Sequence, residues 1–564
     1  MDQWLAKINK LTNWQAVLII TATGFAVFFT GLSNPFIGDD QGQIVDNLPV
    51  HSITNIRLFF EGGTFYNGQG LATLNGVYYR PLMTTVFSLL YTIFGAHSIA
   101  FHLFQLLLCI GSAVILYLYL RYSFKPVLAL FLALVFLVHP INSQIVFAIP
   151  TMQDALFFFF GILALWLLVR LSSIRSLLVV AACLLLSLLS KETGVLFVAL
   201  AMLYLFWWDR RRLLPYIGIM ISPIVLYMVL KVHAVGLNAR STIAPIDQLG
   251  IAGRLLTAPS VALFYIVKFV FPLRLASGYY WVNSSFGFQH VLLPLIVDAA
   301  VVAFIIYMTY VIRARESKAM FCTYLFFVSW AALGLLVHLQ LIPLDFTASE
   351  AWFYFPMAGV LGMIGVLLLA VPIRIKPEWL IIIAVAIISV LGVRTAIRAT
   401  NWRSGYSLAI HDIVASKEDY VAYYVAAGDL IAHGKLNDAK KYTERSISIF
   451  PTSVNYTDLC FILTLTKEYP DAMSACDHAL EYGDLSTTYI DAVRVSLLYG
   501  AQVKAKKLLY ASLEKYPKDS TLWQYMALVY ERNNDNLDAR AAISNAARYG
   551  KVNQTLYNDI MKTQ

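Results

Sequence analysis

Charge is scarce in this chain of 564 residues, since Lys, Arg, Asp and Glu together supply only 13% of it. A soluble globular domain carries about twice that share, and a disordered chain has few apolar residues. Here 59% of the residues are apolar. Both classes are therefore excluded, and the composition predicts a protein that buries much of its surface in a lipid bilayer.

Cysteine is also rare, with five residues in the whole chain. Their spacing matches no metal-binding or disulfide framework. Cys109, Cys183 and Cys322 lie in apolar runs and are expected in the core. Cys460 and Cys476 are spaced so that they could face each other across a helical hairpin, although spacing does not establish a bond. The first apolar run is followed by no small-residue cleavage site, which favours a retained anchor.

The basic excess is confined to one part of the chain. Residues 1–404 carry a net charge of +11, whereas residues 405–564 carry −2. We therefore expect a membrane domain at 1–404 and a soluble domain at 405–564. Much of the positive charge lies in short loops between apolar runs, so we expect it to orient the protein in the membrane and expect no nucleic-acid partner.

Eleven apolar runs are long enough to cross a bilayer, for which about 20 residues are needed, or fewer inside a bundle. They are 14–33, 98–120, 126–139, 152–170, 176–190, 193–208, 214–231, 291–312, 321–341, 352–372 and 378–398. Basic loops such as Arg210–Arg212 and Arg313–Lys318 fall on one side, which the positive-inside rule makes cytoplasmic. This places the N-terminus in the cytoplasm and residue 399 onward outside. Arg394, Arg398 and Arg403 go against the rule.

Two further apolar stretches do not fit this alternation. Residues 81–94 are short, and we expect an interfacial helix within a long first outer loop at 34–97. Residues 255–274 contain two prolines and a lysine, and we expect a re-entrant or obliquely buried segment.

The C-terminal part repeats with a period near 34 residues. The dipeptides at 438–439, 471–472, 504–505 and 538–539 each end in alanine and are spaced by 33, 33 and 34 residues. Small residues at this period let two antiparallel helices approach closely, and the pattern resembles the tetratricopeptide repeat. We predict about four units over 420–550 and a capping helix near 553–563, forming an α-solenoid whose concave face receives a peptide or protein segment.

The first candidate for chemistry is the acidic pair Asp39-Asp40, which follows the first span. One carboxylate can serve as a general base near a lipid headgroup while its neighbour holds a donor or an ion. A solvated loop or a helix N-cap is the simpler interpretation of this dipeptide alone.

Basic residues near the same face form the second group of candidates. Arg80 follows Tyr79 and precedes Pro81, and its planar fork suits a phosphate, although an interfacial anchor is the simpler interpretation of this motif alone. Lys191 and Glu192 interrupt two apolar runs and are either a phosphate cradle or a capped helix break with snorkelling side chains.

Three more positions are polar or aromatic at the edge of apolar helices. His139 closes one run, and Asp154 opens the next, where an acid is costly unless it has a function or a helix N-terminus beside it. Glu350 and Tyr354 lie in an aromatic segment that fits either an interfacial belt or a sugar-stacking surface.

The order of these motifs carries more information than any one of them. A chain with F-x-x-D-D-x-x-x-I-x-x-N at 36–47, Y-R-P-L at 79–82, H-P at 139–140, S-K-E-T-G at 190–194 and E-x-x-x-Y-x-P at 350–356, followed by tetratricopeptide repeats, resembles a known family. It is similar to the transmembrane and tetratricopeptide-containing O-mannosyltransferases, which belong to the membrane glycosyltransferases of the C-type fold. The resemblance implies an all-α protein with about eleven spans followed by the solenoid.

The resemblance also implies an activity. The family transfers a sugar from a polyprenyl phosphate to a protein hydroxyl on the extracytoplasmic side, with inversion. Asp40 or Asp39 would be the catalytic base, and Arg80 and Lys191 would bind the donor phosphate. The remaining pocket residues would be Tyr79, His139, Asp154, Glu192, Glu350 and Tyr354. The chain departs from the family at Asn142 and Gln144, where a His and an acid are usual, and at Tyr280-Trp281, where Asp-Trp is usual.

From these observations we expect an inverting glycosyltransferase with a polyprenyl-phosphate sugar donor, membrane lipids around it and a protein acceptor held by the repeats. The chemistry requires no cofactor or catalytic metal, although the adjacent acids with Glu350 leave room for a divalent ion. The alternatives are the same fold acting on a lipid or cell-envelope polymer, or a membrane-anchored repeat scaffold without catalysis.

Overall fold

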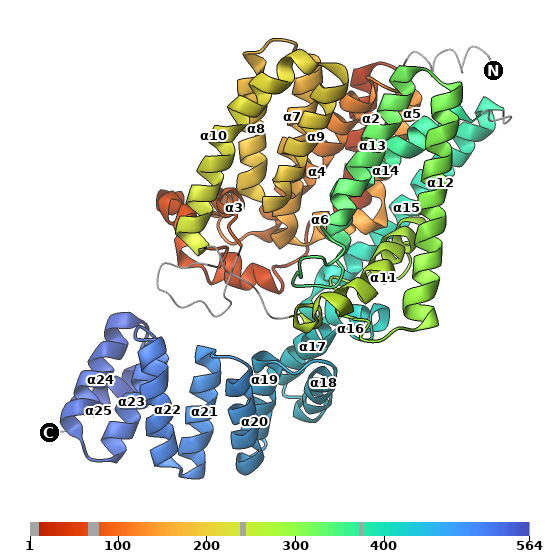
Figure 1. Ribbon diagram of the computed structural model, residues 1–564. Helices are drawn as coiled ribbons and strands as arrows, with labels where there is room; N and C mark the ends of the chain where they lie inside the picture. The colour runs from red at the N-terminus through yellow and green to blue at the C-terminus, as the bar shows by residue number, and fades with distance from the viewer. Residues whose placement is uncertain (1–10, 66–77, 237–243, 372–375, 563–564) are drawn as a thin grey trace. The chain divides into compact units, whose positions relative to one another are not determined.

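The computed structural model (Figure 1) describes residues 11–65, 78–236, 244–371 and 376–562. The protein is all-α, and the only β-type pairing in these residues is an isolated bridge between Tyr279 and Ala348. The chain forms two compact units, which divide between Ser416 and Lys417. The helix just after the predicted boundary at 404, α16, therefore belongs to the first unit.

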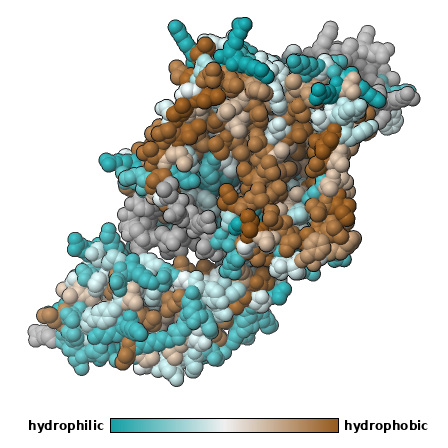
Figure 2. Space-filling model, viewed as in Figure 1, coloured by the Kyte–Doolittle hydropathy of each residue, from teal (hydrophilic) through white to brown (hydrophobic). Residues whose placement is uncertain are grey.

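The first unit is a bundle of apolar helices. Its longer members, numbered as in Figure 1, are α2 (Asn13–Phe28), α3 (Pro81–Phe94), α4 (Ser98–Leu120), α5 (Pro126–Val138), α7 (Met152–Arg170), α8 (Ser176–Ser190), α9 (Val195–Trp208), α10 (Arg210–Val235), α11 (Ile251–Val270), α12 (Leu293–Arg315), α13 (Lys318–Leu336), α14 (Tyr354–Ala370), α15 (Pro377–Arg398) and α16 (Gly405–Ala415). Figure 2 shows apolar side chains over much of the surface of this unit, as expected for helices that face lipid.

Among the described residues, nine helices are long and apolar enough to cross a membrane, and a bent pair makes a tenth. The chain is therefore a multi-pass integral membrane protein. The predicted spans at 176–190 and 193–208 correspond to α8 and α9, which have 15 and 14 residues. They pack inside the bundle against α7, which explains how shorter helices are accommodated.

The bent pair lies at His139-Pro140, where the sequence predicts the end of a span. The chain turns by 49° there and continues as a short helical segment, Pro140–Phe147, that includes α6 (Ser143–Phe147). Proline has no N–H for the helix ladder, so α5 ends before it. The stretch at 255–274, predicted to be re-entrant or oblique, is largely α11, a helix of 20 residues that meets the length and composition of a span. Figure 1 shows α11 running obliquely to α12.

The predicted interfacial helix at 81–94 is α3, whose first residue is Pro81. The first outer loop before it folds into short helical turns, including a π-helical turn at Gln41–Val45 and a 3-10 helix at Ile53–Phe60. Part of this predicted loop, residues 66–77, lies outside the described ranges.

The second unit is the predicted solenoid of helical pairs. The pairs are α17 (Tyr420–Ala432) with α18 (Leu436–Ile449), α19 (Ser453–Leu465) with α20 (Tyr469–Tyr482), α21 (Ser486–Tyr499) with α22 (Gln502–Lys515), and α23 (Ser520–Arg532) with α24 (Asn536–Tyr549). A ninth helix, α25 (Gln554–Lys562), closes the series at the predicted capping position. The period of 33–34 residues therefore corresponds to one helical pair.

The alanines that recur with the period are buried, as their role in close helix packing requires. Ala439, Ala472 and Ala505 are fully buried, and Ala539 is nearly so. In the second pair, a disulfide joins Cys460 of α19 to Cys476 of α20, with Cα atoms 5.2 Å apart. The hairpin arrangement that the spacing allowed is therefore present.

Candidate active site

The acidic motif after the first span is shaped by a glycine. Gly38 has φ +58°, a conformation that residues with a Cβ rarely adopt, and it turns the chain just before the two acids. Asp40 points inward and is 2% exposed, and its Oδ2 accepts a hydrogen bond from the Ile37 N–H at 2.9 Å. Asp39 keeps contact with solvent. The two predicted candidates for the base thus have different environments.

The pKa values of both acids respond to this environment. Burial raises the pKa of Asp40 to about 8, although the hydrogen bond from the Ile37 N–H lowers it. For Asp39, the surrounding protein and then the negative charge of Asp345 raise the pKa. A raised carboxyl pKa is typical of a general base that works near neutral pH.

Arg80 is the residue before α3, and two neighbours position it. Its guanidinium lies 4.1 Å from the centre of the Tyr78 ring, and Nη2 is 3.4 Å from Glu192 Oε1. Burial disfavours its charge, but the acids Glu192, Asp154 and Asp345 around it raise the pKa of Arg80 nonetheless. Arg80 is therefore a permanent cation within an acidic surrounding.

Lys191 ends α8 and points at the first turn of α7. Its Nζ lies 2.6 Å from Asp154 Oδ1, and the two side chains are only 7% and 3% exposed. The N-terminus of α7 also favours a negative charge at Asp154. The structure therefore brings together two residues that the sequence singled out separately, as a buried ion pair.

Asp345, in the loop between α13 and the 3-10 turn Glu350–Phe353, links these groups, and sequence reasoning missed it. It hydrogen-bonds the Tyr78 side chain, and its charge acts on both Asp39 and Arg80. We call the set Asp39, Tyr78, Arg80, Asp154, Lys191, Glu192 and Asp345 the outer-loop cluster. The only sequence signal for Asp345 was its position in a loop on the side predicted to be extracytoplasmic.

Three predicted pocket residues have mainly packing roles in the structure. Tyr79 is 1% exposed, packs against Tyr227 and reaches the Phe60 carbonyl at 3.4 Å. The Tyr354 ring lies 4.7 Å from the rings of both Phe136 and Phe158. His139 caps the bend after α5, since its Nδ1 accepts from the Ile141 N–H and its Nε2 donates to the Phe269 carbonyl.

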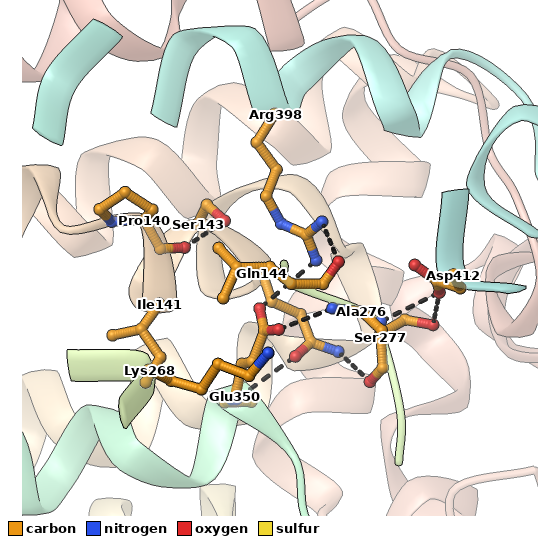
Figure 3. Close-up of polar contacts among 12 residues, drawn as sticks. Pro140, Ile141, Ser143, Gln144, Lys268, Ala276, Ser277, Glu350, Arg398 and Asp412 are labelled. Carbon is orange, nitrogen blue, oxygen red and sulfur yellow. Dashed lines mark hydrogen bonds and ion pairs between the residues drawn. The ribbon is translucent and has the colours of Figure 1, made fainter. Parts of the chain in front are cut away.

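Glu350 lies in a second polar network, drawn in Figure 3. Its Oε1 accepts from the Ala276 N–H and from the Tyr279 hydroxyl, both at 2.7 Å. Its Oε2 is 3.4 Å from Arg398 Nη2, and both side chains are fully buried. Glu350 is therefore placed with the end of α15 and not with the outer-loop cluster.

This network fastens the segment 273–279 that follows α11, which we call the strap. Side chains from different elements hold its backbone: Arg394 at the Leu273 carbonyl, Lys268 at the Arg274 carbonyl, Arg398 at the Leu275 carbonyl, Gln144 at the Ser277 carbonyl and Asp412 at the Ser277 N–H. Figure 3 shows Gln144 and Asp412 meeting Ser277 from different helices. Gln144, a departure from the family pattern, thus has a structural partner in the strap.

Metal-binding geometry is absent from the described ranges, where no three His, Cys, Asp or Glu side chains gather in a suitable arrangement. The outer-loop cluster instead offers an accessible carboxylate, an arginine and a lysine whose charge Asp154 already balances. This set is suited to proton transfer and to holding a phosphate.

Residues 80–235 match the family model described as dolichyl-phosphate-mannose-protein mannosyltransferase. The matched range begins at Arg80 and includes Asp154, Lys191 and Glu192. The resemblance to membrane glycosyltransferases that use a lipid-linked sugar is thereby confirmed for this part of the chain. None of the curated proteins matches the chain.

Two of the solved structures that are similar to the chain have low sequence identity to it. ArnT from Cupriavidus metallidurans bound to undecaprenyl phosphate is 16% identical, with 82% of this chain and 79% of that one covered and a TM-score of 0.38. YrrB, a tetratricopeptide repeat protein with an unusual peptide-binding site, is 14% identical, with 28% and 82% covered and a TM-score of 0.25.

Proposed function

We propose that the protein transfers a sugar from a polyprenyl-phosphate donor to a serine or threonine hydroxyl of a protein, on the extracytoplasmic face and with inversion. The observation that carries this proposal is the outer-loop cluster. In it, the exposed Asp39 and the Arg80 guanidinium are both influenced by the charge of Asp345. The family match over residues 80–235 supports a donor of the lipid-linked class. Mannose is the donor sugar that the matched description favours.

Asp39 is the better placed of the two candidate bases. Its carboxylate is accessible, whereas Asp40 is buried and already engaged with the Ile37 N–H. In the reaction, the acceptor oxygen forms a bond to the anomeric carbon while the bond from that carbon to the phosphate oxygen breaks. The hydroxyl proton passes to the Asp39 carboxylate, and the bonding electrons leave with the polyprenyl phosphate. Asp40 would hold the backbone of this loop in place through its hydrogen bond from the Ile37 N–H.

The leaving phosphate needs a cation that is fixed before the reaction begins. Arg80 is held by Tyr78 and Glu192, so its planar fork is already oriented. Such preorganised charge stabilises a developing anion without further rearrangement. Lys191 adds a second positive charge, although its ion pair with Asp154 limits how far it can shift toward a ligand.

The outward orientation of this site has support from the second unit. The repeats contain the Cys460–Cys476 disulfide, and disulfides persist mainly in extracytoplasmic compartments. The cytoplasmic side would then carry the basic loop Arg210–Arg212 and the N-terminus. The outer-loop cluster and the repeats would lie on the opposite side, where a protein acceptor is reached.

The test is a transfer assay on the purified full chain in lipid nanodiscs, with polyprenyl-phosphate mannose and a Ser/Thr-rich peptide. We expect Asp39→Asn to lower turnover by about 10²–10⁴-fold, the usual effect of losing a general base. Asp46→Asn removes an exposed acid from the same loop and serves as the matched control. Wild-type turnover in Asp39→Asn would show that the base is assigned wrongly.

The pH profile of the same reaction gives a second readout. Asp39 must be deprotonated to accept a proton, and its pKa is raised. Turnover should therefore keep rising with pH above about 3.9, the ordinary pKa of an aspartate, and the rise should vanish in Asp39→Asn. A profile that is already flat at about pH 5 would argue against a base with a raised pKa.

A further inference from the structure

The inner face of the repeat unit is formed by the first helix of each pair. These helices contact one another in succession, α17 with α19, α19 with α21, and α21 with α23. Residues that are one repeat apart therefore form rows across this face. One row contains Asp458, Asp491 and Tyr525, spaced by 33 and 34 residues, and the next contains Gly428, Phe461, Arg494 and Leu528.

Arg494 ties three successive repeats together within these rows. Its Nη1 is 2.7 Å from Asp491 Oδ1 on the same helix, and its Nε donates to the Tyr525 hydroxyl on α23 at 3.1 Å. On the other side, its guanidinium carbon lies 5.6 Å from the centre of the Phe461 ring on α19. The positive charge of Arg494 is therefore already engaged within the repeats.

Asp458 is in the opposite situation, because no cation faces it. Within the described residues it has no hydrogen bond or ion pair, and burial followed by the negative charge of Asp491 raises its pKa to about 7. Arg494 pairs with Asp491, and no cation among the described residues pairs with Asp458, so this part of the face has an excess of negative charge. A second cation near Asp458 would relieve the repulsion between the two acids.

The surroundings of Asp458 leave room for such a cation. Phe461 is on the same helix, three residues on, and its ring offers a π-face of the kind that attracts ammonium and guanidinium groups. In the preceding repeat, the corresponding position is Gly428, where an added Cβ would meet nothing within 4 Å. At this position of the row, the first repeat therefore has no side chain that would block a ligand, whereas the third repeat has Arg494.

We propose that this inner face binds an extended polypeptide segment by a lysine or arginine side chain, which pairs with Asp458 and lies against Phe461. Making that polypeptide the sugar acceptor rests on the function proposed above. The negative charge around Asp458 favours a cationic side chain, and the extended surface of stacked repeats favours a polypeptide segment without secondary structure of its own. The repeats would thus favour acceptors with a basic residue near the glycosylated hydroxyl.

The experiment measures fluorescence anisotropy of labelled peptides on the full chain in nanodiscs. The probes are two short Ser/Thr/Pro peptides that differ only in a central lysine or glutamate. We expect the lysine peptide to bind at least about tenfold more tightly, and Asp458→Asn to remove this preference. Asp471→Asn, an exposed acid on the second helix of the same repeat, is the control and should preserve it.

Two further variants guard against a folding artefact. Asp458→Glu keeps the charge and should retain the preference, whereas Phe461→Leu keeps an apolar side chain and should weaken lysine binding about threefold or more. Equal affinity for the two peptides, no binding of either by the wild type, or an unchanged preference in Asp458→Asn would each overturn the proposal.

The same preparation separates this proposal from the enzymatic one. Hydrolysis of the lipid-linked donor in the absence of peptide should be unchanged in Asp458→Asn. If the wild type never consumes the donor but still prefers the lysine peptide, the proposed function fails and the binding site stands. If the donor is consumed and the peptides are not distinguished, only the binding site fails.

Discussion

Arg80 is the residue whose environment says most about the ligand of the outer-loop cluster. The Tyr78 ring covers one face of its guanidinium, and Glu192 contacts one edge at a rather long 3.4 Å. Its Nε has no hydrogen-bond partner within the described residues. A buried donor without a partner is costly, so a planar, oxygen-rich ligand such as a phosphate would complete its bonding.

Substitution of Arg80 should therefore impair donor binding before it affects stability. Arg80→Ala removes a charge-assisted contact worth about 1.5–3 kcal/mol, which corresponds to roughly a 10–100-fold weaker Kd for polyprenyl phosphate. Arg80→Lys should also weaken binding, because lysine is a point charge and lacks the planar fork. Equilibrium binding of labelled polyprenyl phosphate measures both.

The control for these variants is Arg57→Ala in the same loop. The Arg57 side chain is 91% exposed and pairs with Glu61, the residue that follows its own helical turn, so its loss should leave donor binding unchanged. Equal affinities for the donor in wild type, Arg80→Ala and Arg57→Ala would remove Arg80 from the donor site.

Among the elements, the strap explains why two arginines go against the positive-inside rule. Arg394 and Arg398 go against the positive-inside rule, yet each donates to a strap carbonyl, and Arg398 also pairs with the buried Glu350. Their charge is used for structure, so it need not report on orientation. Because the strap lacks regular secondary structure, its polar backbone groups depend on such side chains.

Breaking the Glu350–Arg398 pair on one side should be more damaging than removing both partners. Arg398→Met leaves a buried carboxylate unpaired, at a cost of about 3–5 kcal/mol, while the double variant with Glu350→Met leaves no uncompensated charge. Thermal unfolding in detergent should therefore rank the double variant above Arg398→Met. Arg394→Met, one turn earlier on α15, should have a smaller effect, and the reverse ranking would contradict a stabilising pair.

The elements were predictable from the sequence where small residues recur with a fixed period or where apolar residues form a long run. The apolar runs predicted the bundle, and the alanines spaced by 33–34 residues predicted the helical pairs. The strap was not predictable, because an irregular segment has no period and its contacts join Glu350 to Arg398 and Ser277 to Asp412 across the fold. For the same reason the sequence predicted Asp39 and Arg80 as site residues without the contacts around them, and Asp345 was missed.

At the scale of the whole molecule, each unit has the surface its solvent requires. The first unit exposes apolar side chains over its helices, and the repeats are largely covered by polar side chains (Figure 2). The first unit contains the outer-loop cluster around Asp39, whereas the second contains the negatively charged inner face around Asp458. Under the two proposals above, the first unit carries out the chemistry and the second selects the acceptor.

We propose above that the outer-loop cluster holds the lipid-linked sugar. The most direct measurement is an experimental structure of the full-length Asp39→Asn variant in nanodiscs with polyprenyl-phosphate mannose. We expect density for the phosphate at the Arg80 guanidinium and for the anomeric carbon facing residue 39. Density for the phosphate beside Arg398 and Lys268, with the surroundings of Arg80 empty, would contradict it.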